Sequence, residues 1–349
     1  MKWIDMHCDT LSEIVKNHAY GNLKKNYLSV DIERLKLAGA SQFFACYVNA
    51  ADYGKKLTGI STYADKNSPV RAENRELWDA AYEAVLDMTE YAWKESGGDF
   101  LIAETAADIP INAAENSTCT NRTAGILTVE EGGVLNGRLS RLDELYKKGV
   151  RLVTLTWNYE NCIGYPNSRD RNIMEKGLTD FGIRTVKRMN ELGMIVDVSH
   201  LSDGGFGDCI RYSRYPVAAS HSNARSLCRH PRNLSDEMLR ALGENGGVAG
   251  LNFYSEFLQE RRGKNDVGRV SVEDIANHAL WMIKKAGEDA VAMGTDFDGF
   301  DPDSLPDGIQ GVQDIEKVWE AMRKKGITPR QIDKIAYGNV MRVIQEVWK

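Results

Sequence analysis

Long hydrophobic runs are missing from this sequence of 349 residues. No apolar stretch approaches the roughly 20 residues that a helix needs to cross a bilayer, so no membrane-spanning segment is predicted. The N-terminus also lacks the pattern of a signal peptide, because residues 2–7 lead at once into a strand-like segment. We therefore expect a protein without a membrane anchor that is not secreted.

Basic runs and paired cysteines are missing as well. The formal net charge is −6, and without a basic patch nucleic acid is not an expected partner. The six cysteines lie at positions 8, 46, 119, 162, 209 and 228, and no Cys-x-x-Cys pair occurs. Scattered thiols are typical of a reducing compartment rather than of a disulfide framework or a zinc knuckle. The sequence thus predicts a cytoplasmic protein.

Nucleotide-binding signatures, internal repeats and interdomain linkers are also absent. No Gly-x-Gly-x-x-Gly or P-loop follows an apolar segment, which removes the usual signature of an open, doubly wound sheet. The hydrophobic share of 42% and the charged share of 27% are ordinary for a globular protein. We therefore expect a single domain over residues 1–349.

The chain does contain a regular alternation of short apolar segments with segments of helical spacing. A helix is expected over residues 70–94, and another after Ser202, which can cap it. Near the C-terminus a helix should begin after Thr328 and stop near Gly338, with Asn339 capping the last helix. The alternation favours a (β/α)8 TIM barrel. The predicted strands are residues 2–7, 42–48, 125–130, 150–156, 194–198, 216–219, 247–253 and 290–295.

Two of these strands end in the same dipeptide, Ser-His. One runs into His200 and the next into His221, with a segment of helix length between them. A strand, a helix and a strand in this order form a unit with parallel strands, so both histidines should lie side by side at one rim. Imidazoles placed there suit metal binding or proton transfer. The alternative is two core histidines that are satisfied by backbone hydrogen bonds.

Other predicted strands end in residues of the same kind. His7 and Asp9 follow the first strand, Glu130 ends the third, and Asp296 and Asp298 follow the last. In a barrel of this type the carboxyl ends of the strands hold the active site. Histidines and carboxylates together suit zinc or a similar divalent ion, and there are enough ligands for two ions. Helix capping would explain single aspartates, but not ligand-type residues at five strand ends.

At these residues the chain resembles the membrane (renal-type) dipeptidases and their bacterial relatives, within the metal-dependent amidohydrolase-like barrels. The resemblance extends over essentially the whole chain, and so many motifs in the same order are highly specific. The motifs are Asp5-Met-His-Cys-Asp9, Val129-Glu-Glu-Gly-Gly133, Gly182 with Asp197-Val-Ser-His200, Ser220-His-Ser222, Arg232-Asn233, Asn252-Phe-Tyr254, Gly294-Thr-Asp-Phe-Asp-Gly299 and Gly338-Asn-Val-Met-Arg342.

The resemblance implies two zinc ions per chain, with other divalent ions as open alternatives. Counting back from the fourth strand places Glu130, not Glu131, at the bridging position, although an offset of one residue stays open. Glu131 is then expected to be a loop residue whose replacement changes little. The implied ligands are His7 and Asp9 for one ion, His200 and His221 for the second, and the glutamate between them.

The resemblance also implies roles in catalysis and substrate binding. Asp296 falls on the acid/base aspartate, which can accept a proton and later deliver it to the leaving amine. Arg232 falls on the arginine that receives the terminal carboxylate of the substrate. Without the resemblance Arg232 would be interpreted as a surface residue near Pro231. Tyr254, in the Asn-Phe-Tyr motif, is expected to contact the substrate.

One departure from the family pattern concerns the end of the fourth strand. Mammalian members carry a substrate-facing histidine there, where this chain has Thr156, Trp157, Asn158 and Tyr159. Loss of that histidine leaves zinc as the main electrophile, with Asn158 or Tyr159 as substitutes. Trp157 is expected either to contact the substrate or to lie in the core. The departure bears on substrate range rather than on reaction type.

The sequence therefore predicts a zinc-dependent dipeptidase that hydrolyses small dipeptides through a metal-bridging hydroxide. Two alternatives stay open. One is another binuclear-metal barrel hydrolase acting on a cyclic amide, a lactone or an aminopurine, and the other is a barrel that binds peptides without catalysis. The expected partner is a small dipeptide, and a homodimer is an open alternative to a monomer.

Overall fold

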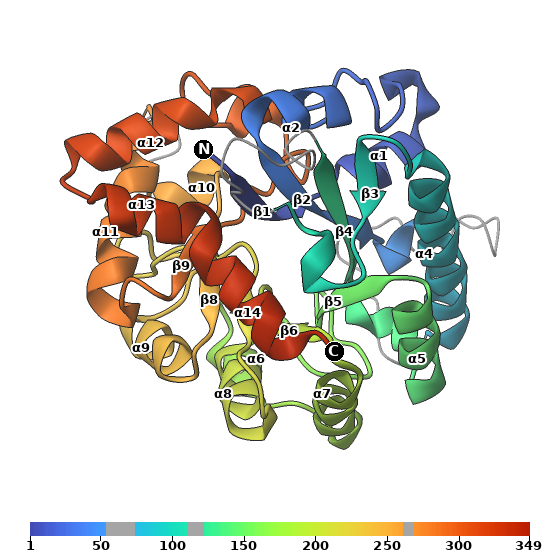
Figure 1. Ribbon diagram of the computed structural model, residues 1–349. Coiled ribbons are helices and arrows are strands. Elements are labelled where there is room, and N and C mark those ends of the chain that lie inside the picture. Colours follow the sequence, from blue (N-terminus) through green and yellow to red (C-terminus); the bar gives the residue numbers. More distant parts are fainter. Residues whose placement is uncertain (54–73, 111–121, 261–268) are drawn as a thin grey trace.

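Eight parallel strands close into a barrel, and helices surround it (Figure 1). The structure is a computed structural model that describes residues 1–53, 74–110, 122–260 and 269–349. The prediction of a (β/α)8 TIM barrel is confirmed, and every predicted strand is present. The barrel strands are β1 (Trp3–Cys8), β2 (Ala40–Tyr47), β4 (Thr123–Glu130), β5 (Val150–Thr154), β6 (Ile195–Asp197), β7 (Ala218–Ala219), β8 (Val248–Leu251) and β9 (Val291–Met293).

The barrel closes between two strands that are not neighbours in sequence. β2 pairs in parallel with β4, from Gln42 opposite Gly125 to Tyr47 opposite Glu130. A short strand between them, β3 (Phe100–Ile102), pairs with the beginning of β4 and stays outside the ring. Because the strands of the ring are all parallel, their carboxyl ends meet at one rim.

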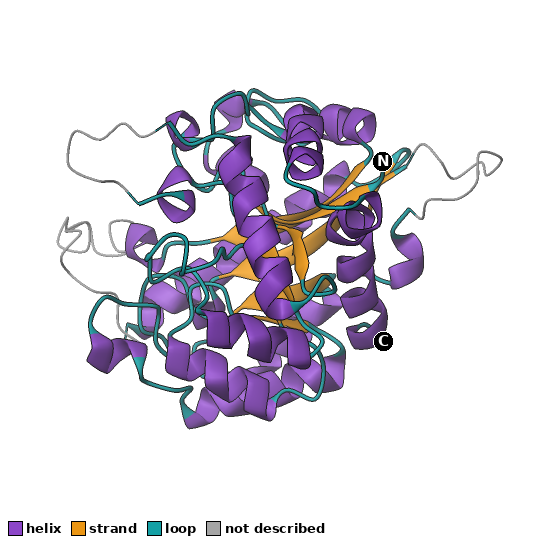
Figure 2. Cartoon of the chain, turned by 90° about the vertical axis from the view of Figure 1, so that its left-hand side faces the viewer, coloured by secondary structure: helices purple, strands orange, loops and turns teal. Residues whose placement is uncertain are grey.

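Two hydrophobic layers stabilise this barrel. The larger lies between the strands and the helices that surround them (Figure 2). The second fills the barrel interior, where Ile195 and Val248, the first residues of their strands, cluster with Ile344 and Val347 of α14. In Figure 1, α14 (Asn339–Val347) crosses the barrel opening. Helix α14 thus closes the amino-terminal end and leaves the opposite rim to polar residues.

Several helices begin and end where the sequence predicts them. Ser202 Oγ accepts a hydrogen bond from the backbone N–H of Gly205, and Gly193 ends the preceding helix with a left-handed φ of 81°. The helix expected over 70–94 is present as α4, although residues 70–73 lie outside the described part. None of the described helices is long and apolar enough to cross a membrane. The helices are α1 (Thr10–Lys16), α2 (Ile32–Ala38), α4 (Arg75–Glu95), α5 (Leu139–Lys147), α6 (Arg171–Met174), α7 (Asp180–Leu192), α8 (Asp203–Tyr212), α9 (Asp236–Glu244), α10 (Ser255–Leu258), α11 (Val272–Ala286), α12 (Ile315–Lys324), α13 (Pro329–Asp333) and α14.

The predicted break near Gly338 is wrong. Helix α13, a π-helical turn over 334–338 and α14 follow one another without interruption, and Gly338 has a right-handed φ of −59°. Asn339 does not cap α14. Its Nδ2 instead donates to the backbone carbonyls of Glu288 and Val291, at 2.8 Å each. These tertiary hydrogen bonds use the side chain that capping would have needed.

Candidate metal centre

Side chains from five strand ends converge at the carboxyl-terminal rim of the barrel. His7 lies near the end of β1, Glu130 is the last residue of β4, and Asp296 follows β9. His200 and His221 follow β6 and β7. Since β6 and β7 pair in parallel, these two rings lie side by side, with centroids 5.1 Å apart.

Glu130 lies at the centre of this cluster. One of its carboxylate oxygens is 3.4 Å from His7 Nε2, and the other is 3.1 Å from His200 Nε2 and 3.6 Å from His221 Nε2. Asp9 Oδ2 also lies 3.4 Å from His7 Nε2. The carboxylate of Glu130 therefore stands between two sets of ligand atoms.

Several buried polar atoms of the cluster have no hydrogen-bond partner among the described residues. They are both ring nitrogens of His7, Oδ1 of Asp9 and Oε1 of Glu130. The Nε2 atoms of His200 and His221 face each other at 3.0 Å. Buried polar atoms are nearly always paired, so this arrangement calls for a bound cation. Imidazole and carboxylate donors within 4.8 Å of one another fit zinc or a similar divalent ion.

Burial and mutual charge shift the pKa values of the cluster in different directions. Burial raises the pKa of Asp296 to about 7, although the positive charge of His7 opposes the shift. Burial lowers the pKa of His200 to about 4. Burial alone would raise the pKa of Glu130, but His7 and His200 hold it well below its ordinary range. Glu130 is thus a carboxylate and His200 a neutral imidazole, the forms that bind metals.

Two residues of the cluster have a left-handed backbone. The φ angles are 67° at His200 and 62° at Asp296, which residues other than glycine rarely adopt. The backbone carbonyl of His200 accepts hydrogen bonds from N and Nδ2 of Asn167. Asn252 Nδ2 donates to Asp296 Oδ2 at 2.8 Å, and Asp296 Oδ1 lies 3.7 Å from His7 Nε2. Strain of this kind is typical of functional sites whose surroundings stabilise it.

Arg232 is buried beside the cluster, with 5% of its surface exposed, so its interpretation as a surface residue is wrong. Its guanidinium donates two long hydrogen bonds of 3.3 Å, to Ser222 Oγ and to the backbone carbonyl of His221. Its Nε has no partner among the described residues. Burial lowers the pKa of Arg232 to about 10, so the side chain stays charged at neutral pH.

Aromatic rings border the cluster at the end of β5. The ring of Trp157 is partly buried, and its centroid lies 5.1 Å from that of Tyr47, 5.7 Å from that of Tyr159 and 6.3 Å from that of His200. The next residue, Asn158, places Oδ1 at 3.2 Å from His200 Nδ1. Trp157 thus lies between the core and the site, and Asn158 contacts one of the candidate ligands.

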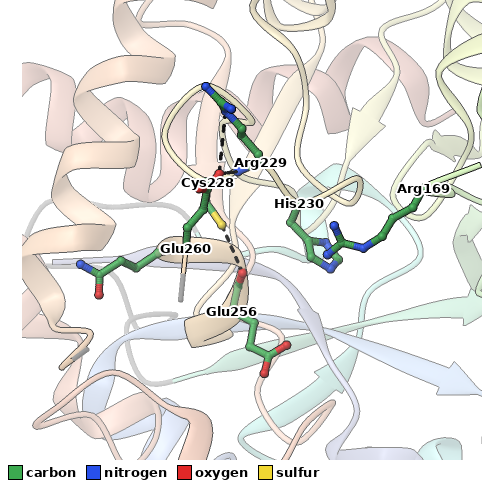
Figure 3. Close-up of a pocket in the computed structure, with 7 residues that line it drawn as sticks. Arg169, Cys228, Arg229, His230, Glu256 and Glu260 are labelled. Carbon is green, nitrogen blue, oxygen red and sulfur yellow. Dashed lines mark hydrogen bonds and ion pairs between the residues drawn. The ribbon is translucent and has the colours of Figure 1, made fainter. Parts of the chain in front are cut away.

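A cavity of 440 Å³ opens beside His230, two residues before Arg232 (Figure 3). The ring of Phe257 contacts both Arg232 and His230. Its centroid lies 5.5 Å from Arg232 Cζ, 4.5 Å from the centroid of His230 and 4.8 Å from that of Tyr254. In Figure 3 the guanidinium of Arg169 lies next to His230. The cavity is lined by Arg169, Cys228, Arg229, His230, Glu256, Gln259 and Glu260.

The family model of the membrane dipeptidases, peptidase family M19, matches residues 1–349. The chain belongs to this family. A Schizosaccharomyces pombe protein named as an uncharacterized dipeptidase is 31% identical over 313 residues, which cover 88% of this chain and 68% of that protein. A Klebsiella pneumoniae protein from the pqqA 5′ region is 35% identical over 259 residues, which cover 71% of this chain and 93% of that protein.

Solved structures agree with this assignment. A metallopeptidase from Rhodobacter sphaeroides, liganded with a phosphinate mimic of the dipeptide L-Ala-D-Ala, is 28% identical to this chain. It superposes with a TM-score of 0.81 over 100% of this chain and 99% of its own. As a membrane dipeptidase family member, the chain is a metal-dependent hydrolase of the dipeptidase class, as the sequence motifs predict.

In this chain, Glu131 is a loop residue, as expected, but its side chain is buried. One carboxylate oxygen accepts hydrogen bonds from Gly133 N at 2.9 Å and Asn161 Nδ2 at 2.6 Å. The other accepts from Trp157 N at 3.1 Å. Glu131 is only 1% exposed, so its replacement should affect stability, while little change in metal content and activity stays a prediction.

Glu131→Gln should lower the free energy of unfolding by about 1–3 kcal/mol. Both carboxylate oxygens of Glu131 accept from N–H groups, so the amide NH2 that replaces one of them would face another donor. The metal content should not change. Denaturant unfolding and metal analysis of the purified variant check both expectations. Glu83→Gln, at an exposed position of α4, is the matched control and should be as stable as the wild type.

Three polar residues that support the site have no role in the sequence-based prediction. Asp197 ends β6, Ser220 precedes His221, and Asn252 follows β8. All three are fully buried. The position of Asp197 in an apolar strand could have indicated a buried polar role. Its hydroxyl partners, Thr154 and Ser220, are distant in the sequence and could not be assigned from it.

Proposed function

We propose that this protein is a binuclear zinc dipeptidase that cleaves the peptide bond of a small dipeptide. The position of Glu130 carries the proposal, because its two oxygens face His7 on one side and His200 and His221 on the other. In the proposed centre His7 and Asp9 would hold one ion, His200 and His221 would hold the second, and Glu130 would supply a ligand oxygen to each. When bound, the two ions supply an activated water and polarise the scissile carbonyl.

Asp296 is the proposed proton carrier. Its carboxyl group is buried beside the ligand cluster, and a carboxylate placed there can accept a proton from a neighbouring water and later return it. Asn252 holds Oδ2, while Oδ1 is directed toward His7 and the ligand cluster. Asp296 would take the proton of the attacking water and deliver it to the nitrogen of the leaving amine.

Arg232 is the proposed receptor of the substrate's terminal carboxylate. Its two existing hydrogen bonds are long and its Nε is unpaired, so the guanidinium has capacity for a carboxylate. A guanidinium can bind a carboxylate through two parallel hydrogen bonds, which would hold the scissile carbonyl over the metal centre. Trp157, Asn158 and Tyr254 are proposed to border the rest of the substrate.

Arg232→Met should remove most of the preference for dipeptides with a free terminal carboxylate over their C-terminal amides. A charged hydrogen bond of this kind contributes roughly 1.5–3 kcal/mol, or about 10–150-fold in kcat/KM, and the loss should fall on the acids. Steady-state kinetics on paired acid and amide substrates measures the ratio. Arg229 is a nearby exposed arginine, and Arg229→Met should leave the ratio of acid to amide cleavage unchanged. Equal cleavage of acid and amide by the wild type would exclude Arg232 as the receptor.

Hydrolysis of L-L, L-D and D-D dipeptides tests the function itself. The Rhodobacter sphaeroides relative is liganded with a mimic of L-Ala-D-Ala, so dipeptides with a C-terminal D residue belong in the panel. Turnover of a dipeptide would support the proposal. Turnover of a cyclic amide, a lactone or an aminopurine alone would favour the other barrel hydrolases. A metal-loaded protein that turns over none of them would be a peptide-binding barrel.

We also infer a single catalytic domain over residues 1–349, since β1 near one end of the chain and α14 near the other belong to the same barrel. A cytoplasmic location is supported by the five cysteines of the described residues, which are all free thiols. A homodimer stays a prediction.

A further inference from the structure

A buried chain of hydrogen bonds leads from His221 away from the metal centre. His221 Nδ1 lies 2.7 Å from Ser220 Oγ, and Ser220 Oγ donates to Asp197 Oδ2 at 2.6 Å. Asp197 and Ser220 have no exposed surface, and His221 has 1%. On the other edge of the same ring, Nε2 faces Glu130 and His200. The imidazole thus lies between the ligand cluster and a buried carboxylate.

The protons of this chain can be counted. Asp197 accepts four hydrogen bonds, from the backbone N–H groups of Ser199 and Ser220 and from the hydroxyls of Thr154 and Ser220. A serine hydroxyl has one proton, and that of Ser220 is used toward Asp197. Its oxygen can therefore only accept from His221, so Nδ1 of His221 carries the ring proton. The lone pair of Nε2 is then directed at the ligand cluster, which is the form that binds a metal ion.

We propose that Ser220 and Asp197 are positioning residues that hold His221 in its metal-binding tautomer and so set the affinity for one of the two ions. This inference rests on the proposed metal centre. Neighbours of this kind, which hydrogen-bond to a ligating histidine, fix the orientation and the tautomer of the ring, and their loss typically weakens metal binding by about 10–100-fold.

The second histidine of the same proposed ion is held differently. His200 Nδ1 contacts the side-chain amide of Asn158, in a loop rather than in a strand. His221 has a carboxylate behind it, whereas His200 has a neutral amide. A hydrogen bond that leads to an ionised group is stronger and better oriented than one to a neutral group. We therefore expect His221 to be the ligand whose support matters more for affinity.

Ser220→Ala tests the inference, with Thr154→Val as its matched control. Thr154 also donates to Asp197 at 2.6 Å from a buried strand end, but the structure gives it no contact with His221. Each protein is stripped of metal and titrated with Zn²⁺ against a chromogenic chelator, and the visible spectrum of the Co²⁺ form is recorded. In Ser220→Ala one ion should bind about 10–100-fold more weakly, with a changed Co²⁺ spectrum, while the other binds normally. Thr154→Val should bind both ions as the wild type does.

Asp197→Asn provides a second, isosteric variant in case Ser220→Ala does not fold. The amide nitrogen of the new side chain would donate to Ser220, which would turn the serine proton toward His221 Nδ1. The ring would then carry its proton on Nε2, where it blocks the metal. Zinc affinity for one ion should fall at least as far as in Ser220→Ala.

The outcomes separate the two levels of the argument. If the wild type binds no zinc, the proposed metal centre fails. If the wild type binds two ions and both Ser220→Ala and Asp197→Asn bind them equally tightly, the centre stands and the positioning role is refuted. An equal loss of affinity in Thr154→Val would also refute it, because the effect would then come from general disruption of the strand ends.

Discussion

Asp296→Asn is expected to lower kcat by roughly 10²–10⁴-fold, the usual contribution of a general acid–base group, while both metal ions stay bound. The amide has the shape of the carboxyl group and its oxygen can still accept from Asn252, so the loop should keep its conformation. It cannot accept a proton and return it. Steady-state kinetics together with metal analysis of the purified variant measures both effects.

Asp298→Asn is the matched control for this experiment. Asp298 lies two residues further along the same loop, also with a left-handed φ, but its carboxylate accepts hydrogen bonds from Ser29 N and Thr10 Oγ1 instead of facing the ligand cluster. Its replacement should affect stability and leave kcat close to the wild-type value. Loss of metal in Asp296→Asn would make Asp296 a ligand, and a normal kcat would remove it from the mechanism.

Removal of the metal ions is expected to abolish hydrolysis entirely, and added zinc should restore it. Buried ligand atoms of His7, Asp9 and Glu130 lack a hydrogen-bond partner among the described residues, and two ions supply the nucleophile in a centre of this kind. Elemental analysis should find about two divalent ions per chain. Full activity of a metal-free preparation would contradict the mechanism.

Glu130→Gln should lose metal and activity together, because one amide cannot bridge two cations. Glu131→Gln is its control, since Glu131 is directed away from the ligand cluster toward Gly133, Trp157 and Asn161. The opposite result, with metal lost only in Glu131→Gln, would move the bridging position by one residue.

The barrel itself follows from local patterns. Each strand is a short apolar run, and the helices have apolar faces, several of them with a cap such as Ser202 or a terminating glycine such as Gly193. Such signals lie within a few residues of one another, so they can be recognised without knowledge of the fold. The order of pairing is not local. Residues 100–102 stay outside the ring because β4 pairs with β2 rather than having β3 inserted between them. This pairing joins segments about 80 residues apart.

The same division applies to the site. The sequence shows which ligand-type residues stand at strand ends, and parallel strands bring those ends to one rim. These residues are His7, Glu130, His200, His221 and Asp296. Which of two adjacent glutamates faces the histidines is a matter of side-chain direction. Glu131 continues the extended backbone just beyond the end of β4, with φ of −134° and ψ of 141°. Successive side chains of an extended chain point to opposite sides, so Glu130 and Glu131 have different surroundings although they are neighbours.

Sequence alone therefore determined the fold class, the family and the kinds of residue at the rim, since strand patterning and motif order are properties of contiguous residues. Only the tertiary structure decided which polar groups are buried and what they bind. Asn339 donates to two backbone carbonyls instead of capping a helix, and Asp197 accepts hydrogen bonds from hydroxyls at the end of β5 and just after β7. Hydrogen-bond partners and burial depend on residues that are distant in the chain and meet only when the barrel closes.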